Sequence, residues 1–164
     1  PSSLINPLQV SLGLGHACVL DDSGIQCWGH QGDGRSTVPD SLINPTQVSS
    51  GDYHACALDD TGVVCWGYEG EGQTSVPDSL SNATQVSSGF LHTCTLDDSG
   101  VVCWGSDSHG QTTVPSTLSN PTQVSSGGYH TCALDDTGVV CWGTDMGSQS
   151  LNTGISKLRF IICN

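Results

Sequence analysis

Short alternations of apolar and polar residues, separated by clusters of Gly, Asp, Asn and Pro, run through nearly the whole chain. Within residues 45–82, the stretch Tyr53–Leu58 places Tyr and two Ala on one side and His, Cys and Leu on the other. Comparable short stretches occupy Thr46–Ser49, Val63–Trp66 and Gln73–Val76. A period of two predicts strands joined by turns, and no segment keeps a helical period over three turns. We therefore expect an all-β protein with almost no helix.

The whole pattern recurs every 38 residues, as the spacing of His16, His54, His92 and His130 shows. A fixed period of this length is typical of stacked arrays, because each unit buries its apolar face only against a neighbour. The chain begins in the middle of a unit, as expected of a mature or excised piece. The predicted repeats cover about residues 7–44, 45–82, 83–120 and 121–154, with 1–6 as the end of a preceding unit and 155–164 as a divergent tail.

The segment Asp59-Asp60-Thr61-Gly62 predicts a tight turn, because Asp bonds its own backbone and Gly accepts a positive φ. A two-residue loop would place Cys56 opposite Cys65, within reach of a disulfide, whereas a Gly bulge would shift the register by one residue. We expect a disulfide within each hairpin, and bridges between neighbouring repeats remain the alternative. The expected pairs are Cys18–Cys27, Cys56–Cys65, Cys94–Cys103 and Cys132–Cys141, and the odd Cys163 is either free or joined to another chain.

Metal binding is the main rival interpretation of the repeated His, Cys and Asp residues. The repeat lacks the closely spaced Cys or His pairs that structural zinc sites use, so we prefer a buried His bonded to the backbone of the next repeat. Adjacent Asp residues in a tight turn, such as Asp59-Asp60, supply too few oxygens for calcium. Turn formation is therefore the preferred role, with a weak surface calcium site as the alternative, and we expect no metal or cofactor.

The composition indicates the compartment in which the protein resides and excludes some classes of partner. The nine cysteines, largely paired within repeats, indicate an oxidising compartment, so we expect a secreted protein. The formal net charge is −13, and the three basic residues are Arg35, Lys157 and Arg159. A nucleic-acid partner requires a basic patch, which this chain lacks. No apolar run is long enough to span a membrane.

The repeat resembles that of the regulator of chromosome condensation superfamily, and most closely its short-repeat branch, which includes a propeller-type β-lactamase inhibitor protein. The matching residues include Gly51-Asp52-Tyr53-His54, Trp66-Gly67 and Gly72-Gln73-Thr74, and the resemblance covers roughly residues 4–150. It implies a β-propeller-type array of four-stranded blades around a central axis, with the Trp packed between strands of a blade. The fold alone does not fix the function.

This sequence departs from the family pattern in three ways. The paired cysteines are additional, and only four units are present where the family usually closes with about seven blades. The first and last copies lose the Gly-Gln-Thr element, which reads Gly34-Arg35-Ser36 and Gly147-Ser148-Gln149. An open row of blades exposes strand edges, so self-assembly into rings or fibres is one possible role.

No catalytic motif is present, and every candidate catalytic residue recurs in every repeat, so we expect no enzyme. The loops after each Trp-Gly pair vary, and in a propeller such loops gather on one face. We therefore predict a non-enzymatic scaffold that binds a protein, or copies of itself, as a homo-oligomer or as part of a longer chain. The alternatives are a self-assembling structural protein and a carbohydrate-binding module.

The candidate binding residues come from these variable loops, and Asn82-Ala83-Thr84 is in addition a permitted N-glycosylation site in a secreted eukaryotic protein. The loop residues are His30, Asp33, Tyr68, Glu69, Glu71, Asp107, His109 and Asp145.

Overall fold

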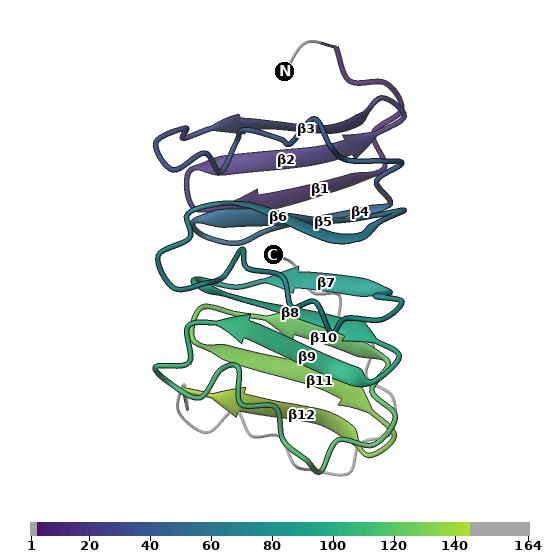
Figure 1. Ribbon diagram of the computed structural model, residues 1–164, viewed down its shortest axis with the longest axis vertical. Helices are drawn as coiled ribbons and strands as arrows, with labels where there is room; N and C mark the ends of the chain where they lie inside the picture. Colours follow the sequence, from purple (N-terminus) through teal and green to yellow (C-terminus); the bar gives the residue numbers. More distant parts are fainter. Residues whose placement is uncertain (1–2, 145–164) are drawn as a thin grey trace.

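The computed structural model describes residues 3–144, and within them the chain forms twelve strands in four antiparallel sheets of three strands each. The sheets, here called blades, follow one another from the N-terminal to the C-terminal end (Figure 1). The strands are β1 (Gln9–Gly13), β2 (His16–Asp21), β3 (Gly24–Gly29), β4 (Gln47–Ser50), β5 (His54–Asp59), β6 (Gly62–Gly67), β7 (Gln85–Ser88), β8 (His92–Asp97), β9 (Gly100–Gly105), β10 (Gln123–Ser126), β11 (His130–Asp135) and β12 (Gly138–Gly143).

The turn between β5 and β6 has the two-residue loop that its sequence predicts. Asp59 pairs with Gly62 and Cys56 pairs with Cys65 in the strand register. The Asp59 carboxylate accepts hydrogen bonds from the Thr61 N–H at 2.7 Å and the Thr61 hydroxyl at 2.6 Å, and Gly62 has a φ of 117°. The same register recurs in the other blades, so the local chemistry of the Asp-Asp-x-Gly turn fixes each hairpin.

All four expected disulfides lie within their own hairpins, so the alternative of bridges between repeats is wrong for these cysteines. Their Cα atoms are 4.0–4.1 Å apart, slightly below the roughly 4.5 Å of the closely spaced opposed residues in an antiparallel pair. The expectation for Cys163 falls outside the described residues.

Successive blades are joined by hydrogen bonds from Gln and Ser side chains to the backbone of the next inner strand, where a sheet would have bonds between two backbones. The Gln47 side chain accepts a hydrogen bond from the Val86 N–H at 2.9 Å and donates to the Val86 carbonyl at 3.2 Å. Ser49 accepts from the Ser88 N–H at 2.9 Å. The bonds from backbone N–H groups to the Gln and Ser side chains recur between β1 and β4 and between β7 and β10. The repeated Gln-Val-Ser-Ser stretch therefore serves as the joint between successive inner strands.

The repeated His also joins blades, although not in the way expected from the sequence. His54 is fully buried, and its Nε2 lies 2.8 Å from the Thr93 hydroxyl of the next blade, rather than bonding directly to backbone. Thr93 in turn donates to the Gln73 carbonyl at 2.9 Å. His92 repeats the arrangement with Thr131 at 3.0 Å. The His side chain is thus linked to a backbone carbonyl indirectly, through a threonine hydroxyl that bonds to both.

The all-β, four-blade architecture is confirmed, but the stretch Gln73–Val76 forms turns where a fourth strand was expected. Ser75 N–H donates to the Gly72 carbonyl at 3.1 Å, in a turn. The Gln73 carbonyl accepts from the Trp104 indole N–H at 3.0 Å and from Thr93. This backbone is bonded to side chains of the next blade, so it does not join a ladder.

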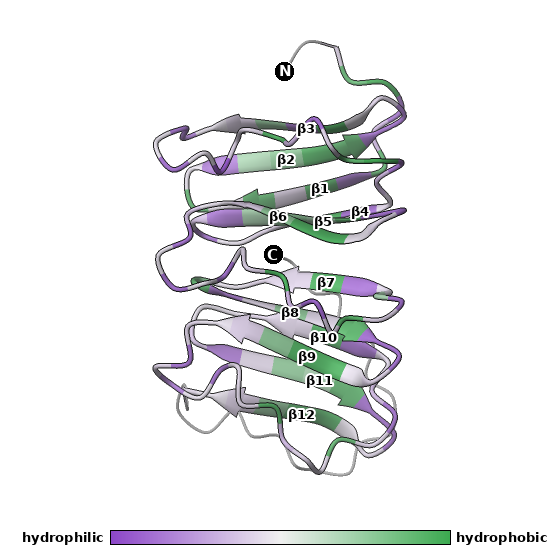
Figure 2. Cartoon of the chain, viewed as in Figure 1, coloured by the Kyte–Doolittle hydropathy of each residue, from purple (hydrophilic) through white to green (hydrophobic). Residues whose placement is uncertain are grey.

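Apolar residues concentrate along the strands, and polar residues gather in the loops and turns at the strand ends (Figure 2). Val48, Val86 and Val124 on the inner strands are 1–2% exposed, because each packs against the preceding blade. Val10 occupies the same position in the first blade and is 63% exposed. Within residues 3–144, the structure contains no helix long and apolar enough to cross a membrane.

Candidate binding surface

The variable loops gather at one end of the blades, on the left in Figure 1. In each blade the loop after the third strand bonds to the turn after the first, as in the 2.9 Å bond from Tyr68 N–H to the Tyr53 carbonyl. Equivalent bonds occur in the other three blades. We call this surface the loop face, and it comprises residues 13–16, 30–36, 51–54, 68–74, 89–92, 106–112 and 127–130.

Seven of the eight candidate binding residues lie on the loop face, and Asp145 lies outside the described residues. The side chains of five of the seven, His30, Asp33, Glu69, Asp107 and His109, are bonded within their own loops. Glu69 accepts from the Thr74 N–H at 3.1 Å, and Asp107 accepts from the Thr112 N–H at 2.8 Å. The hydrogen bonds outweigh partial burial and lower the pKa of Asp107. These carboxylates therefore shape the loops.

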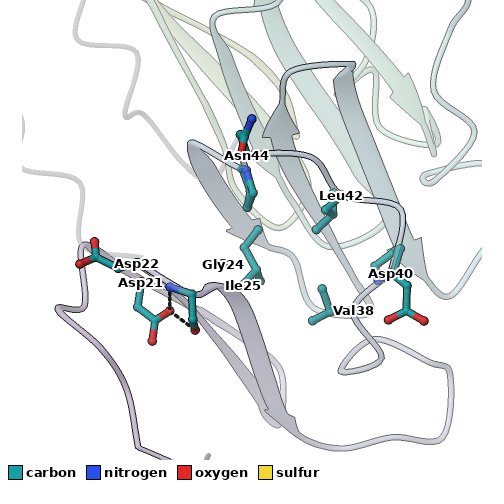
Figure 3. Close-up of a pocket in the computed structure, with 11 residues that line it drawn as sticks. Asp21, Asp22, Gly24, Ile25, Val38, Asp40, Leu42 and Asn44 are labelled. Carbon is teal, nitrogen blue, oxygen red and sulfur yellow. Dashed lines mark hydrogen bonds between the residues drawn. The ribbon is translucent and has the colours of Figure 1, made fainter.

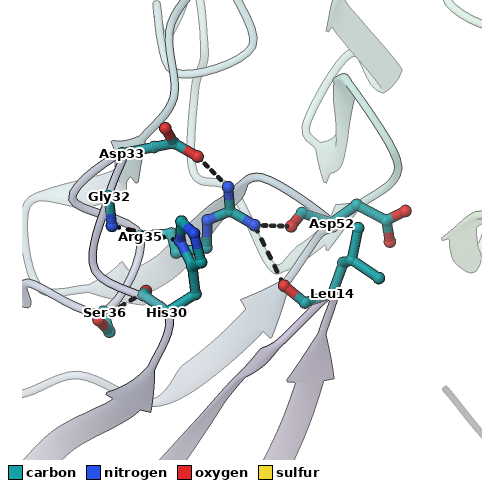
Figure 4. A network of polar contacts seen from close by, with 7 residues as sticks. All are labelled: Leu14, His30, Gly32, Asp33, Arg35, Ser36 and Asp52. Atoms are coloured by element: carbon teal, nitrogen blue, oxygen red, sulfur yellow. Dashed lines mark hydrogen bonds and ion pairs between the residues drawn. The ribbon is translucent and has the colours of Figure 1, made fainter.

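Arg35 forms the densest polar network of this surface (Figure 4). Its side chain is buried, its Nη1 donates to the carbonyls of Leu14 at 3.1 Å and Asp52 at 2.8 Å, and its Nη2 pairs with the Asp33 carboxylate. The guanidinium carbon lies 4.6 Å from the centre of the Tyr53 ring. The sequence showed Arg35 as a departure from the repeat, but its stacking and pairing required the structure.

A row of aromatic rings crosses the loop face from the second blade to the fourth. Tyr53 lies 5.2 Å from Phe90, Phe90 lies 5.1 Å from Tyr129, and Tyr129 lies 4.8 Å from His109, measured between ring centres. Tyr68 joins the row beside Tyr53 at 6.1 Å. Tyr68 and Tyr129 are 41% and 40% exposed. These five residues form the aromatic row.

The predicted binding residues include Tyr68 and His109 but not the rings that connect them. Tyr53 and Tyr129 stand at a variable position directly before the repeated His, which was a usable signal. Phe90 stands one position earlier in its repeat, so alignment of the repeats does not place it with the tyrosines.

Asp52 borders the aromatic row. Its N–H donates to the Gly89 carbonyl at 3.2 Å, which places it beside the turn that carries Phe90. Partial burial raises the pKa of the Asp52 carboxyl, and the Arg35 charge opposes this shift. Glu71, in the loop that carries Tyr68, is exposed. Neither carboxylate accepts a hydrogen bond from any residue in the described part of the chain.

The opposite face contains an open pocket of about 450 Å³ between the β2–β3 turn and the connecting segment 38–45 (Figure 3). Asp21, Asp22 and Asp40 line it together with the apolar Val38 and Leu42. The Asp21 carboxylate accepts from the Ser23 hydroxyl at 2.5 Å and the Ser23 N–H at 2.8 Å, and these bonds lower its pKa. No cluster of His, Cys, Asp or Glu in residues 3–144 is arranged to hold a metal ion. The Asp21 carboxylate therefore holds its own turn.

Asn82, the predicted glycosylation site, is exposed on this opposite face. Its Nδ2 donates to the Asp98 carboxylate at 2.6 Å, and its φ is 51°. Asn44 and Asn120 make the same bond in their repeats. The position therefore has a structural role, and glycosylation stays a prediction.

A family model described as "Regulator of chromosome condensation (RCC1) repeat" matches residues 46–73, 83–111 and 122–147. No curated protein sequence matches the chain. The matched ranges fall on the second, third and fourth blades, and they include the strands that carry the repeated His, Cys and Trp.

Solved structures of similar fold include two plant receptor-kinase ectodomains. The CR4 ectodomain of Physcomitrella patens is 26% identical with a TM-score of 0.71, over 87% of this chain and 42% of that one. The ACR4 ectodomain of Arabidopsis thaliana is 28% identical with a TM-score of 0.70, over 88% and 58%. Yeast Prp20p is 18% identical, with a TM-score of 0.74 over 87% and 46%, and supports the fold alone. The chain spans about half the length of these structures.

Proposed function

Because the chain belongs to the regulator of chromosome condensation (RCC1) repeat family, we propose that it is an extracellular, non-enzymatic scaffold that binds a protein through its loop face. The aromatic row carries this proposal, since exposed aromatic rings beside polar groups are characteristic of protein-binding surfaces. The row joins residues from three blades, so it exists only when the blades stack.

The disulfides support the extracellular part of the proposal. One disulfide in each blade favours an oxidising compartment. Two of the similar solved structures are ectodomains of receptor kinases. Yeast Prp20p, which has a similar fold, binds Gsp1p and histones and forms a complex with Kap60, and these proteins are partners of that relative.

Site-specific photo-crosslinking tests the proposal. A benzophenone amino acid is placed at Tyr68 on the loop face or at Ile43 on the opposite face, where the native side chain is 51% exposed. Each variant is incubated with the secreted and cell-surface proteins of the source organism. We expect defined protein adducts from position 68 and none from position 43. Equal labelling from both positions, or none from either, would contradict the proposal.

A second candidate function is association between blades of different chains. The inner strand β1 exposes Val10 and Leu12, which are 63% and 55% exposed, and the equivalent Val48 is buried by the blade before it. Exposed apolar strand faces favour association. Light scattering over a dilution series tests this function, with Val10→Asp expected to lower the molar mass if association uses β1.

A further inference from the structure

We infer that the aromatic row is the docking site for a cationic, arginine-bearing segment of the partner protein. The inference rests on the proposed function and names the chemistry of the partner. The bound segment would lay guanidinium groups on the rings of Phe90 and Tyr129 and pair them with the neighbouring carboxylates.

The protein already contains one example of this mode of binding. The Arg35 guanidinium lies 4.6 Å from the centre of the Tyr53 ring. It also pairs with the Asp33 carboxylate, as Figure 4 shows. A guanidinium over an aromatic face is attracted by the ring quadrupole, and a carboxylate at its edge adds a charge-assisted hydrogen bond. The loop face is therefore built to accommodate this side chain in at least one place.

The next rings of the row lack such a cation. Gln73 and Gln111 replace Arg35 in the following repeats, and both are buried, with their side-chain oxygens accepting N–H groups of their own loops. Arg35 is the single Lys or Arg in residues 3–144. Within the described part of the chain, the faces of Phe90 and Tyr129 thus have no cationic partner.

Charge favours a cation over a neutral ligand at these rings. Asp52 is bonded through its backbone to the turn that carries Phe90, and Glu71 belongs to the loop that carries Tyr68. Neither carboxylate accepts a hydrogen bond from the described residues, and burial already disfavours the ionised form of Asp52. A guanidinium placed near Asp52 would relieve this unfavourable burial. The net charge of −13 would also steer a basic segment towards the protein.

The spacing of the rings suits an extended peptide. Phe90 lies 5.2 Å from Tyr53 and 5.1 Å from Tyr129. Side chains on one face of an extended chain are about 6–7 Å apart, so long arginine side chains at alternate positions can reach neighbouring rings. A short cationic segment would therefore span the row.

Fluorescence anisotropy with two matched peptides tests the inference. One labelled peptide carries arginines separated by glycine and serine, and in the other every arginine is replaced by the uncharged citrulline. We expect the arginine peptide to bind roughly 10-fold or more tightly, and added salt to weaken it. Phe90→Ala and Tyr129→Ala should each weaken binding roughly 3- to 30-fold, and circular dichroism confirms that each variant is folded.

Matched variants separate this site from general attraction between opposite charges. Asp52→Asn and Asp78→Asn remove the same charge, but Asp78 is the counterpart of Asp40 on the opposite face. Ile43→Ala is the apolar control for Phe90→Ala on that face. We expect weaker binding for Asp52→Asn and Phe90→Ala, with their controls near the parent affinity.

Several results would overturn the inference. Equal affinity for the arginine and citrulline peptides would do so, as would equal losses in the loop-face variants and their controls. Binding of neutral oligosaccharides in preference to the arginine peptide would assign the row to a glycan instead. If crosslinking at position 68 still captured a protein, the proposed function would stand without this partner chemistry.

Discussion

The contact between the first and second blades lacks a hydrogen bond that later contacts have. His54 Nε2 lies 2.8 Å from the Thr93 hydroxyl in the next contact, whereas His16 meets Ala55 at the equivalent position. His16 is 5% exposed, and neither of its ring nitrogens has a hydrogen-bond partner among the described residues. We predict that Ala55→Thr supplies the partner and stabilises the protein.

The size of the effect follows from what Thr93 does. Its hydroxyl donates to the Gln73 carbonyl at 2.9 Å, so it accepts from a protonated Nε2 of His54. A threonine at position 55 would bond the Arg35 carbonyl and His16 in the same way. A net hydrogen bond contributes about 1 kcal/mol, and relief of a buried unpartnered group about 1–3 kcal/mol. We expect the free energy of unfolding to rise by about 1–3 kcal/mol, equivalent to roughly 2–10 °C in Tm.

Urea unfolding with oxidised disulfides, followed by tryptophan fluorescence, measures the effect. Thr93→Ala is the matched reverse change, and we expect it to lower the free energy of unfolding by about 2–3 kcal/mol. In Ala55→Thr, NMR should show a slowly exchanging Nε2 proton on His16. If Thr93→Ala destabilises while Ala55→Thr has no effect, the reasoning is refuted, because His16 would then already be satisfied by a buried water.

Two further predictions concern the same joints. Burial lowers the pKa of His54 to about 3 and of His92 to about 4, so the unfolded chain binds protons that the folded chain excludes below the ordinary value of 6.5. The free energy of unfolding should reach its full value above about pH 6.5 and be lower by about 2 kcal/mol per ring at about pH 5, where carboxylates are still ionised. Urea midpoints that stay constant over this range would contradict the prediction. In Gly51→Ala the new methyl would meet the His54 ring and the Gly89 carbonyl of the next blade, so we expect the free energy of unfolding to fall by more than about 2 kcal/mol in thermal unfolding. The control Gly128→Ala has open space around the new methyl and should be nearly neutral, and similar losses in both variants would refute the steric argument.

Local chemistry made the hairpins predictable from sequence. The carboxylate of Asp59 closes its own turn and Gly62 accepts a positive φ, so the register and the pairing of Cys56 with Cys65 follow from nearby residues. The same reasoning was wrong for the segment after Gly72, where a strand was expected. The Gln73 carbonyl bonds instead to side chains of the next blade. An alternating pattern cannot reveal that a distant indole and hydroxyl take the place of a neighbouring strand.

The candidate site was predictable only as a set of variable loops. Repeat alignment identifies Tyr68 and His109 as variable positions, but it places Phe90 in the column of Asp52 and not with Tyr53. The rings meet because successive blades are held together by the hydrogen bonds between their inner strands. The stacking geometry, and with it the aromatic row, therefore required the structure.

The contact between the first and second blades differs from the later contacts at Arg35 and at Ala55. The residue at position 55 affects stability, whereas the Arg35 side chain affects the binding surface. A threonine at position 55 would bond the Arg35 carbonyl, whereas the guanidinium is held by Asp33 and by the carbonyls of Leu14 and Asp52. Ala55→Thr should therefore raise stability without changing affinity for the arginine peptide, because the added bond does not reach the guanidinium or the rings. If affinity for the arginine peptide rose together with stability, the added bond would be ordering the loop at residues 30–36. Preorganisation of that loop would then contribute to binding.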